Sequence, residues 1–387
     1  MDGYTSKIYA AAAGAALYFG ASKYVEDSKV RLLVGPSDEN KELKKLLNQC
    51  PSLSENSRLV PTPYLCSGML QTVYGTQIAL RKDRASNIKY VRESKVMSDG
   101  GTVSLDWYPE QPSDDVTSIA IVVPGLGGSA YEYHIRCVVR RMYESIKDMR
   151  IVVCNHRGSG RTPLTSPRLY NAYDTSDLTD VLNELSTKFP HARLVCIGFS
   201  LGANLITRYL GDHGHSARLS AAVAVSCPYD TEVAGRALSA PGLLNDWLFQ
   251  PNLMATVKRL LRRNIDVIKS SPLNYDIDAI MKASRMSEID DLVTARTYGH
   301  KDCWAYYKAA SSVEYVEKIR KPFLAINAED DPVTPISGVP KDKFANNPST
   351  ALALVKHGGH IGFFTGVMSP KIWYLDPVAE FVSAVLE

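Results

Sequence analysis

An apolar run that breaks at a Gly-x-Ser-x-Gly turn constrains this chain more than any other feature. Residues 194–197 are apolar and partly β-branched, and residues that favour a helix follow Ser200. A serine at such a strand-to-helix turn adopts a strained backbone conformation, so the residues two positions before and after it must lack bulk. Gly198 and Gly202 meet that requirement. The stretch predicts a nucleophile elbow, with an ordinary glycine-punctuated turn between strand and helix as the alternative.

Backbone donors for a developing oxyanion are expected on both sides of Ser200. The helix predicted to start at Leu201 and to end at Gly211 presents free N–H groups in its first turn, where the helix dipole also favours negative charge. A second donor is expected at Leu126, in the glycine-rich loop 124–129 that follows an apolar strand. This loop lacks the Lys-Ser/Thr of a P-loop and the spacing of a dinucleotide fingerprint, so the oxyanion role is favoured over nucleotide binding.

The composition is that of a globular protein and excludes several classes of function. The 387 residues are 45% hydrophobic and 22% charged, which suffices to bury one large core or a core with a subdomain. The formal net charge of +3 gives no argument for nucleic-acid binding. The seven cysteines are scattered and without metal-ligand spacing, so neither a metal nor a cofactor is predicted. We expect buried free thiols in a reducing, intracellular compartment, which disfavours Cys196 and Cys227 as nucleophiles.

Apolar strands alternate with amphipathic helices along most of the chain. Strands are expected over residues 88–97, 102–107, 119–123, 150–154, 194–197, 221–227, 322–327 and 351–355. The first two form a hairpin around a Ser-Asp-Gly-Gly turn, and helices are expected over 131–146 and 175–189. This alternation predicts an α/β fold with a mostly parallel central sheet flanked by helices.

One long interruption divides the predicted core. Residues 228–320 contain no convincing strand and show helical spacing, between a first part of the core at 61–227 and a second part at 321–387. A helical insertion between two sheet strands would lie above the strand ends, where α/β folds place their sites, so a lid is the expected role. One of its helices has a basic face, which is either solvated or in contact with anionic lipid. The basic residues are Lys258, Arg259, Arg262, Arg263 and Lys269.

The N-terminal region, residues 1–24, has a different character. Residues 8–21 are uncharged and alanine-rich, and the tyrosines in and around them suit a headgroup interface. A membrane-associated helix or short anchor is favoured, with a soluble docking helix and a cleaved targeting peptide as alternatives. The polar, charged stretch 38–55 marks residues 25–60 as a connector.

The second half of the chain contains a serine together with an acid and a base of the kind that could activate it. A serine hydroxyl becomes a nucleophile when a base takes its proton, and the base needs an orienting carboxylate. The candidates are Ser200, Asp331 and His360, each at the carboxyl end of a predicted strand and in the order typical of α/β-hydrolases. Asp330 and Glu329 are rivals for the acid, and Asp331 is favoured because a proline fixes the turn just after it.

The base also has rivals. His357 competes with His360, which is favoured because the two glycines before it allow the loop to carry an imidazole over the sheet. His156 is a further candidate base, although a histidine at a strand-end turn more often orders the loop. His213 and His215 lie in a polar stretch and are interpreted as surface residues.

From about residue 61 to the C-terminus the chain resembles the α/β-hydrolases grouped as the AB hydrolase 4 family. That family includes fungal medium-chain ethyl ester synthase/esterases and mammalian abhydrolase-domain acylglycerol and phospholipid lipases. The resemblance implies a triad of Ser200, Asp331 and His360 and hydrolysis of acyl esters. Some relatives carry an H-x-x-x-x-D motif for acyl transfer, which this chain lacks. The segments that carry the resemblance are 61–72 with its Gly-Met-Leu-Gln-Thr, 99–107, 124–128, 155–177, 198–202, 287–312, 327–335 and 358–362.

The sequence therefore predicts a serine carboxylic ester hydrolase that works through an acyl-enzyme. The expected substrates are acylglycerols or medium- and short-chain fatty acyl esters. An alcohol O-acyltransferase or ethyl ester synthase with the same triad is one alternative, and a non-catalytic ligand-binding protein on the same fold is another. The expected partners are a lipid or small acyl ester and a membrane surface, with no nucleic acid and no metal.

Overall fold

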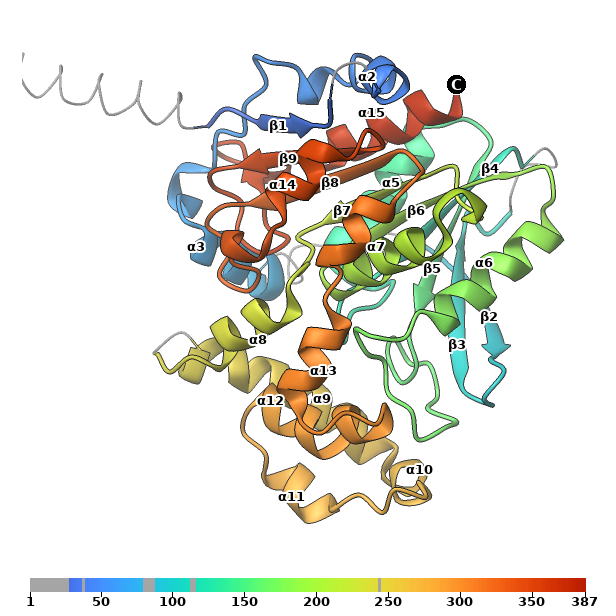
Figure 1. The fold of residues 1–387 in the computed structure, drawn as a ribbon, viewed down its shortest axis with the longest axis vertical. Coiled ribbons are helices and arrows are strands. Elements are labelled where there is room, and N and C mark those ends of the chain that lie inside the picture. The colour runs from blue at the N-terminus through green and yellow to red at the C-terminus, as the bar shows by residue number, and fades with distance from the viewer. Residues whose placement is uncertain (1–27, 37–38, 79–87, 112–115, 243–244) are drawn as a thin grey trace, which may run out of the picture.

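The computed structural model describes residues 28–36, 39–78, 88–111, 116–242 and 245–387. The N-terminal segment 8–21, predicted to associate with a membrane, lies outside these residues. A central sheet is covered by helices on both faces, and a helical region extends away from one end of the strands (Figure 1). Within the described ranges, no helix is both long enough and apolar enough to cross a bilayer.

Nine strands of the described chain form one sheet in the order β1-β9-β8-β7-β6-β4-β5-β3-β2. From β9 to β5 in this order the neighbours run parallel, whereas β1, β3 and β2 pair antiparallel with β9, β5 and β3. The predicted α/β fold with a mostly parallel sheet is confirmed. The strands are β1 (Arg31–Val34), β2 (Val91–Val96), β3 (Thr102–Tyr108), β4 (Ser118–Val123), β5 (Met149–Asn155), β6 (Arg193–Phe199), β7 (Ala221–Val225), β8 (Phe323–Ala328) and β9 (Thr350–Val355).

Alternate residues of the central strands supply two cores, one on each face of the sheet. In β4, Ala120 and Val122 belong to one core, and Ile119, Ile121 and Val123 belong to the other. Strands buried on both faces need apolar residues at every position, which is why they appear in the sequence as continuous apolar runs. One core contains residues of α2 (Lys41–Leu47), α5 (Tyr133–Ser145) and α15 (Leu375–Leu386), and the other contains residues of α6 (Ser176–Lys188), α7 (Leu201–His213) and α14 (Lys341–Asn346).

The helix after the serine turn ends later than the sequence predicts. Gly211 does not terminate α7, which continues to His213. A Cβ at Gly211 would lie 2.6 Å from the Cβ of Tyr315, in the 3₁₀-helix η7 (Val313–Lys318), so the glycine permits close packing there. Gly214, with φ +50°, is the residue that ends the helix.

Part of residues 25–60, expected to be a connector, is built into the core. Arg31–Val34 forms β1, which pairs antiparallel with β9 along the edge of the sheet. Leu43 and Leu47 of α2 are buried in the same core as α15. The strand is only four residues long and begins with an exposed arginine, so its apolar pattern is too short to be recognised without its distant partner.

Every described element between β7 and β8 is helical. Figure 1 shows these helices gathered beyond one end of the sheet. They have a small core of their own, which includes Met254, Leu261 and Ile280. The elements are α8 (Thr231–Ser239), η5 (Asn245–Phe249), α9 (Gln250–Arg263), α10 (Ile265–Lys269), α11 (Ile277–Lys282), α12 (Met286–Ile289), η6 (Asp290–Ala295), α13 (Cys303–Ala310) and η7.

The remaining elements are short and lie mainly in two connecting regions. They are η1 (Pro51–Leu53), η2 (Pro63–Leu65), α3 (Gly68–Val73), η3 (Tyr74–Ile78), η4 (Gly214–Ser216), η8 (Ile336–Gly338) and a small hairpin of β10 (Phe364–Thr365) and β11 (Lys371–Ile372). A bridge between Pro61 and Thr365 joins the region before α3 to this hairpin.

Candidate active site

Ser200 stands in a strained turn between β6 and α7. Its φ and ψ are 49° and −118°, a conformation that non-glycine residues rarely adopt. A Cβ at Gly198 would lie 2.8 Å from the nitrogen of Ala203, and a Cβ at Gly202 would lie 2.3 Å from the carbonyl oxygen of Val123. Both glycines are therefore required by close backbone approach, as the predicted elbow demands.

The structure brings the three residues of the predicted triad together. His360 follows β9 in a loop that crosses the carboxyl ends of the strands. Its Nε2 lies 2.9 Å from Ser200 Oγ, and its Nδ1 lies 2.9 Å from Asp331 Oδ2. A carboxylate only accepts hydrogen bonds, so Nδ1–H donates to Asp331 and Nε2 is free to accept the proton of the serine hydroxyl.

Asp331 is held rigidly and away from water. Its side chain is 0% exposed. One carboxylate oxygen accepts the backbone N–H groups of Val333 and Thr334, at 2.8 and 2.9 Å. The other accepts the hydroxyl of Thr334 at 2.6 Å in addition to His360 Nδ1. These donors fix the direction in which the carboxylate presents an oxygen to the imidazole.

The rival acid and the rival base pair with each other. Asp330 Oδ2 lies 3.0 Å from His357 Nδ1, and Asp330 Oδ1 accepts the backbone N–H groups of Gly358 and Gly359, at 2.9 and 3.0 Å. Glu329, the third candidate acid, forms an ion pair with Arg31. Asp330 therefore supports the loop that leads to His360, while Asp331 contacts the imidazole itself.

The glycine-rich loop after β4 lies beside Ser200. A Cβ at Gly125 would be 3.1 Å from Ser200 Cβ and 3.6 Å from Ser200 Oγ. The predicted donor Leu126 thus directly follows Gly125, which lies against Ser200. The other predicted donor, Leu201, directly follows Ser200 itself. Helix α9 of the insertion packs on this loop, since a Cβ at Gly127 would be 2.8 Å from the Thr256 methyl group.

His156 orders the same loop. Its Nε2 lies 3.0 Å from the carbonyl oxygen of Pro124, and its ring stacks on Tyr170 with centroids 3.4 Å apart. Burial lowers the pKa of His156 to about 4, so the imidazole stays neutral at physiological pH. With its ring engaged in this way, His156 fits the loop-ordering role and not that of a base.

A second histidine near the triad, His134 in α5, carried no signal in the sequence. Its ring packs edge-to-face on Phe199, the residue before Ser200, with centroids 5.1 Å apart. Its Nε2 is buried without a hydrogen-bond partner among the described residues. Burial, together with the nearby His360, lowers the pKa of His134 to about 3. The group therefore adds no positive charge beside Ser200 at neutral pH.

Two other kinds of chemistry receive no support in the described part of the chain. Burial raises the pKa of Cys196 and of Cys227 well above the usual value, so neither supplies a thiolate at neutral pH. The described residues contain no group of three His, Cys, Asp or Glu side chains arranged to hold a metal ion.

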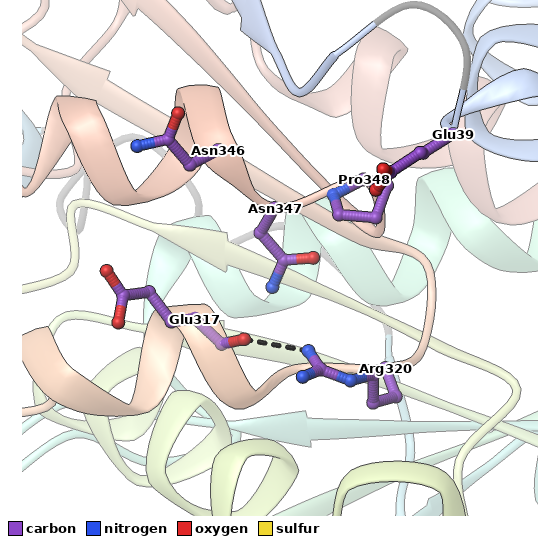
Figure 2. Close-up of a pocket in the computed structure, with 6 residues that line it drawn as sticks. All are labelled: Glu39, Glu317, Arg320, Asn346, Asn347 and Pro348. Atoms are coloured by element: carbon purple, nitrogen blue, oxygen red, sulfur yellow. Dashed lines mark hydrogen bonds between the residues drawn. The ribbon is translucent and has the colours of Figure 1, made fainter.

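A cavity of about 310 Å³ (Figure 2) lies at the other end of the parallel strands from Ser200. Arg320 precedes β8 and Asn347 precedes β9, whereas Ser200 and Asp331 follow the ends of their strands. Arg320 donates a hydrogen bond to the carbonyl oxygen of Glu317 at 2.7 Å, which is the dashed line in Figure 2. The cavity is therefore separate from the triad. Its lining residues are Glu39, Glu317, Arg320, Asn346, Asn347 and Pro348.

Similar proteins are found by sequence and by structure. A family model described as alpha/beta hydrolase fold matches residues 121–367. A monoacylglycerol lipase of Saccharomyces cerevisiae is 30% identical over 309 residues, covering 78% of this chain and 68% of the relative. The phospholipase ABHD3 of Mus musculus is 30% identical over 367 residues, covering 93% and 85%. The esterase Pf2001 of Pyrococcus furiosus, a solved structure, has a TM-score of 0.50 at 16% identity and covers 78% of this chain and 94% of that one.

These similarities extend over most of the chain and are not limited to one motif. An abhydrolase domain-containing protein of Dictyostelium discoideum is also 30% identical, over 90% of this chain and 92% of the relative. The resemblance inferred from the motifs is thus confirmed for the family, and the esterase structure independently has the same fold. The chain belongs to the α/β-hydrolase family.

Proposed function

We propose that Ser200, His360 and Asp331 form the catalytic triad of an acyl ester hydrolase that acts on lipids. The observation that carries this proposal is the continuous chain of hydrogen bonds from Ser200 Oγ through His360 to the buried Asp331 carboxylate. The class of enzyme rests on separate ground. The chain is a serine ester hydrolase because relatives that match most of its length are lipases of the same family.

The proposed reaction proceeds through an acyl-enzyme. Ser200 Oγ attacks the ester carbonyl carbon while His360 Nε2 takes the hydroxyl proton, and Asp331 stabilises the imidazolium that forms. The N–H groups of Leu126 and Leu201 stabilise the oxyanion of the tetrahedral intermediate. When the intermediate collapses, the bond to the alcohol oxygen breaks and His360 returns its proton to that leaving group. Water, activated by the same imidazole, then releases the carboxylic acid and regenerates Ser200.

The proposed substrates are esters with an acyl chain, of the acylglycerol, phospholipid or medium- and short-chain fatty acyl type. Two relatives support this choice, one named monoacylglycerol lipase and the other phospholipase. Products separate hydrolysis from transfer, because an acyl-enzyme that reacts with ethanol or glycerol yields a new ester where water yields the free acid. We expect free acid to be the main product.

We propose that the substrate is met at an intracellular membrane surface. Arg259, Arg262 and Arg263 of α9 and the neighbouring Lys269 are exposed, and α9 packs directly on the loop beside Ser200. Exposed cations on an amphipathic helix are attracted to anionic lipid headgroups. Flotation with vesicles that contain phosphatidylserine should recover more protein than flotation with neutral vesicles, and equal recovery would contradict the role of this basic face.

A fluorophosphonate probe tests the triad without knowledge of the substrate, because it reports nucleophile activation alone. Peptide mapping should place the label on Ser200 in the wild-type protein, and His360→Ala should slow labelling by about a thousandfold or more. His215→Ala, which removes an exposed histidine, is the matched control and should label at the wild-type rate. Full labelling of the folded His360→Ala protein, or label on another residue, would overturn the proposal.

A further inference from the structure

Helix α3, which carries the Gly-Met-Leu-Gln-Thr motif, lies against the loop that presents His360. A Cβ at Gly68 would be 2.0 Å from the carbonyl oxygen of Asp330, and a Cβ at Gly359 would be 2.1 Å from the carbonyl oxygen of Gly68. The absence of side chains at these two glycines lets the backbones of helix and loop touch. This contact connects a helix in the first fifth of the chain to both the acid turn and the histidine loop.

Thr72 makes a direct hydrogen bond to the histidine of the triad. It is buried, with 3% of its surface exposed. Its Oγ1 donates to the carbonyl oxygen of Gly68 at 2.7 Å and accepts the backbone N–H of His360 at 2.8 Å. The single hydroxyl proton is used by the first bond, so the lone pairs are directed at His360. The two residues lie 288 positions apart in the sequence.

The neighbouring residue of α3 holds the other end of the same loop. Gln71 is fully buried, and its Oε1 accepts the backbone N–H of Phe364 at 2.6 Å. Two consecutive helix residues therefore anchor the loop immediately at and shortly after His360.

The loop needs such anchors because its backbone is strained. Ile361 has φ +62° and Phe363 has φ +50°, although neither is a glycine. Residues with side chains keep this left-handed conformation only when their surroundings hold them there. The donors of the loop are held by Thr72, by Gln71 and by Ser226, whose Oγ accepts the N–H of Ile361 at 3.0 Å.

We propose that Thr72 is a positioning residue that fixes the backbone of His360 so that Nε2 stays within hydrogen-bond reach of Ser200. This inference rests on the proposed triad. A displacement of about 1 Å in a reacting group can lower the rate about a hundredfold, so the loss of one backbone hydrogen bond at His360 should lower kcat. Because Thr72 is buried beneath the loop, we expect no contact between Thr72 and the substrate.

The test compares Thr72→Val with Thr72→Ser. Valine has nearly the same shape but neither accepts from His360 nor donates to Gly68, whereas serine retains both bonds. We expect Thr72→Val to lower kcat and the fluorophosphonate labelling rate by about 10- to 100-fold with KM within about threefold of wild type. Thr72→Ser should remain within about threefold in every parameter.

Thr62→Val is the matched control. Thr62 is also a buried threonine, and its Oγ1 donates to the carbonyl oxygen of Gly366, beyond the part of the loop that carries His360. We expect this variant to lose thermal stability while its labelling rate, per folded molecule, stays within about threefold of wild type. If Thr72→Val does not fold, Gln71→Met carries the test, with an expected loss of about fivefold or more in kcat and unchanged KM.

Ser200→Ala, run in the same assay, separates the two levels of failure. If Ser200→Ala keeps its activity, the proposed triad is wrong. If Ser200→Ala is inactive but folded Thr72→Val labels at the wild-type rate, the triad stands and the positioning role is wrong. Equal losses in Thr72→Val and Thr62→Val would also overturn it, because they would show a general effect on stability.

Discussion

Two carboxylate–imidazole pairs lie side by side in this molecule, and they differ in what they contact next. Asp331 with His360 and Asp330 with His357 come from the same two segments, and their N–O distances are 2.9 and 3.0 Å. The first pair continues to Ser200 Oγ, and its carboxylate is fully buried. In the second pair, Asp330 is 24% exposed and uses its other oxygen on the backbone of Gly358 and Gly359.

The comparison shows that contact between a carboxylate and an imidazole does not identify a catalytic pair. The group that each pair touches next decides its role. In the proposed triad, a serine hydroxyl within reach of Nε2 allows proton transfer, whereas the two glycine amides on the Asp330 carboxylate hold the loop in place. The residue types are the same in both pairs, so substitutions that remove the same atoms from each pair should separate the two roles.

The largest difference is expected for the two acids. Asp331→Asn removes the charge that stabilises the imidazolium and disturbs the tautomer of His360, so kcat should fall by about 10³- to 10⁴-fold. Initial rates on a soluble acyl ester, with the fluorophosphonate labelling rate beside them, measure this loss. A loss of less than about tenfold would contradict the role of Asp331 as the orienting acid.

The same substitution at the neighbouring acid should cost much less. Asp330→Asn keeps one oxygen for the amides of the loop but weakens these bonds, because charge-assisted hydrogen bonds are about twice as strong as neutral ones. We expect kcat to fall by about 3- to 30-fold, with a lower melting temperature in a thermal denaturation scan. Losses of equal size at Asp330 and Asp331 would erase the distinction between the two pairs.

A still smaller effect on activity is expected at the histidine of the brace. His357→Gln removes the imidazole from Asp330 and leaves both glycine amides in place, so kcat should stay within about threefold of wild type. The corresponding change His360→Gln should abolish measurable turnover. Steady-state kinetics of the two variants, which differ only in position, provide the comparison.

A buried histidine without a carboxylate partner should make the stability of the fold depend on pH. Burial lowers the pKa of His156 to about 4, so the unfolded chain binds more protons than the folded one between about pH 6.5 and 4. Stability from this group is present above pH 6.5 and is lost as the pH falls toward 4, by on the order of 2–3 kcal/mol. Urea denaturation across this range should show a smaller loss for His156→Phe, and an unchanged pH dependence would contradict the account.

Much of the fold follows from local patterns. Continuous apolar runs predict the buried parallel strands, and the spacing of two glycines around Ser200 predicts the strained turn that the structure contains. The order of serine, acid and histidine limits the site to a few residues. None of these inferences needs a known contact between distant segments, because the apolar pattern of a strand and the glycines of a strained turn are visible among neighbouring residues.

Other features could not be predicted from the sequence because they depend on partners far away in the chain. Gly211 has the appearance of a helix stop, but it is the contact point of α7 with Tyr315. The strand Arg31–Val34 has too few residues to show a pattern. It forms because it pairs with the free edge of β9. Thr72 belongs to a motif that carries the family resemblance, but nothing local indicates its contact, since its partner is a backbone amide 288 residues away.

The sequence by itself determined the alternation of strands and helices, the serine turn and the small set of candidate acids and bases. Only the tertiary structure decided which acid meets which base, and that α3 lies beneath the histidine loop. The physical reason is one of range. The apolar pattern of a strand and the glycines of a strained turn lie within a few residues. Asp330 and Asp331, by contrast, are adjacent acids that differ in which way each side chain points when β8 and β9 pair.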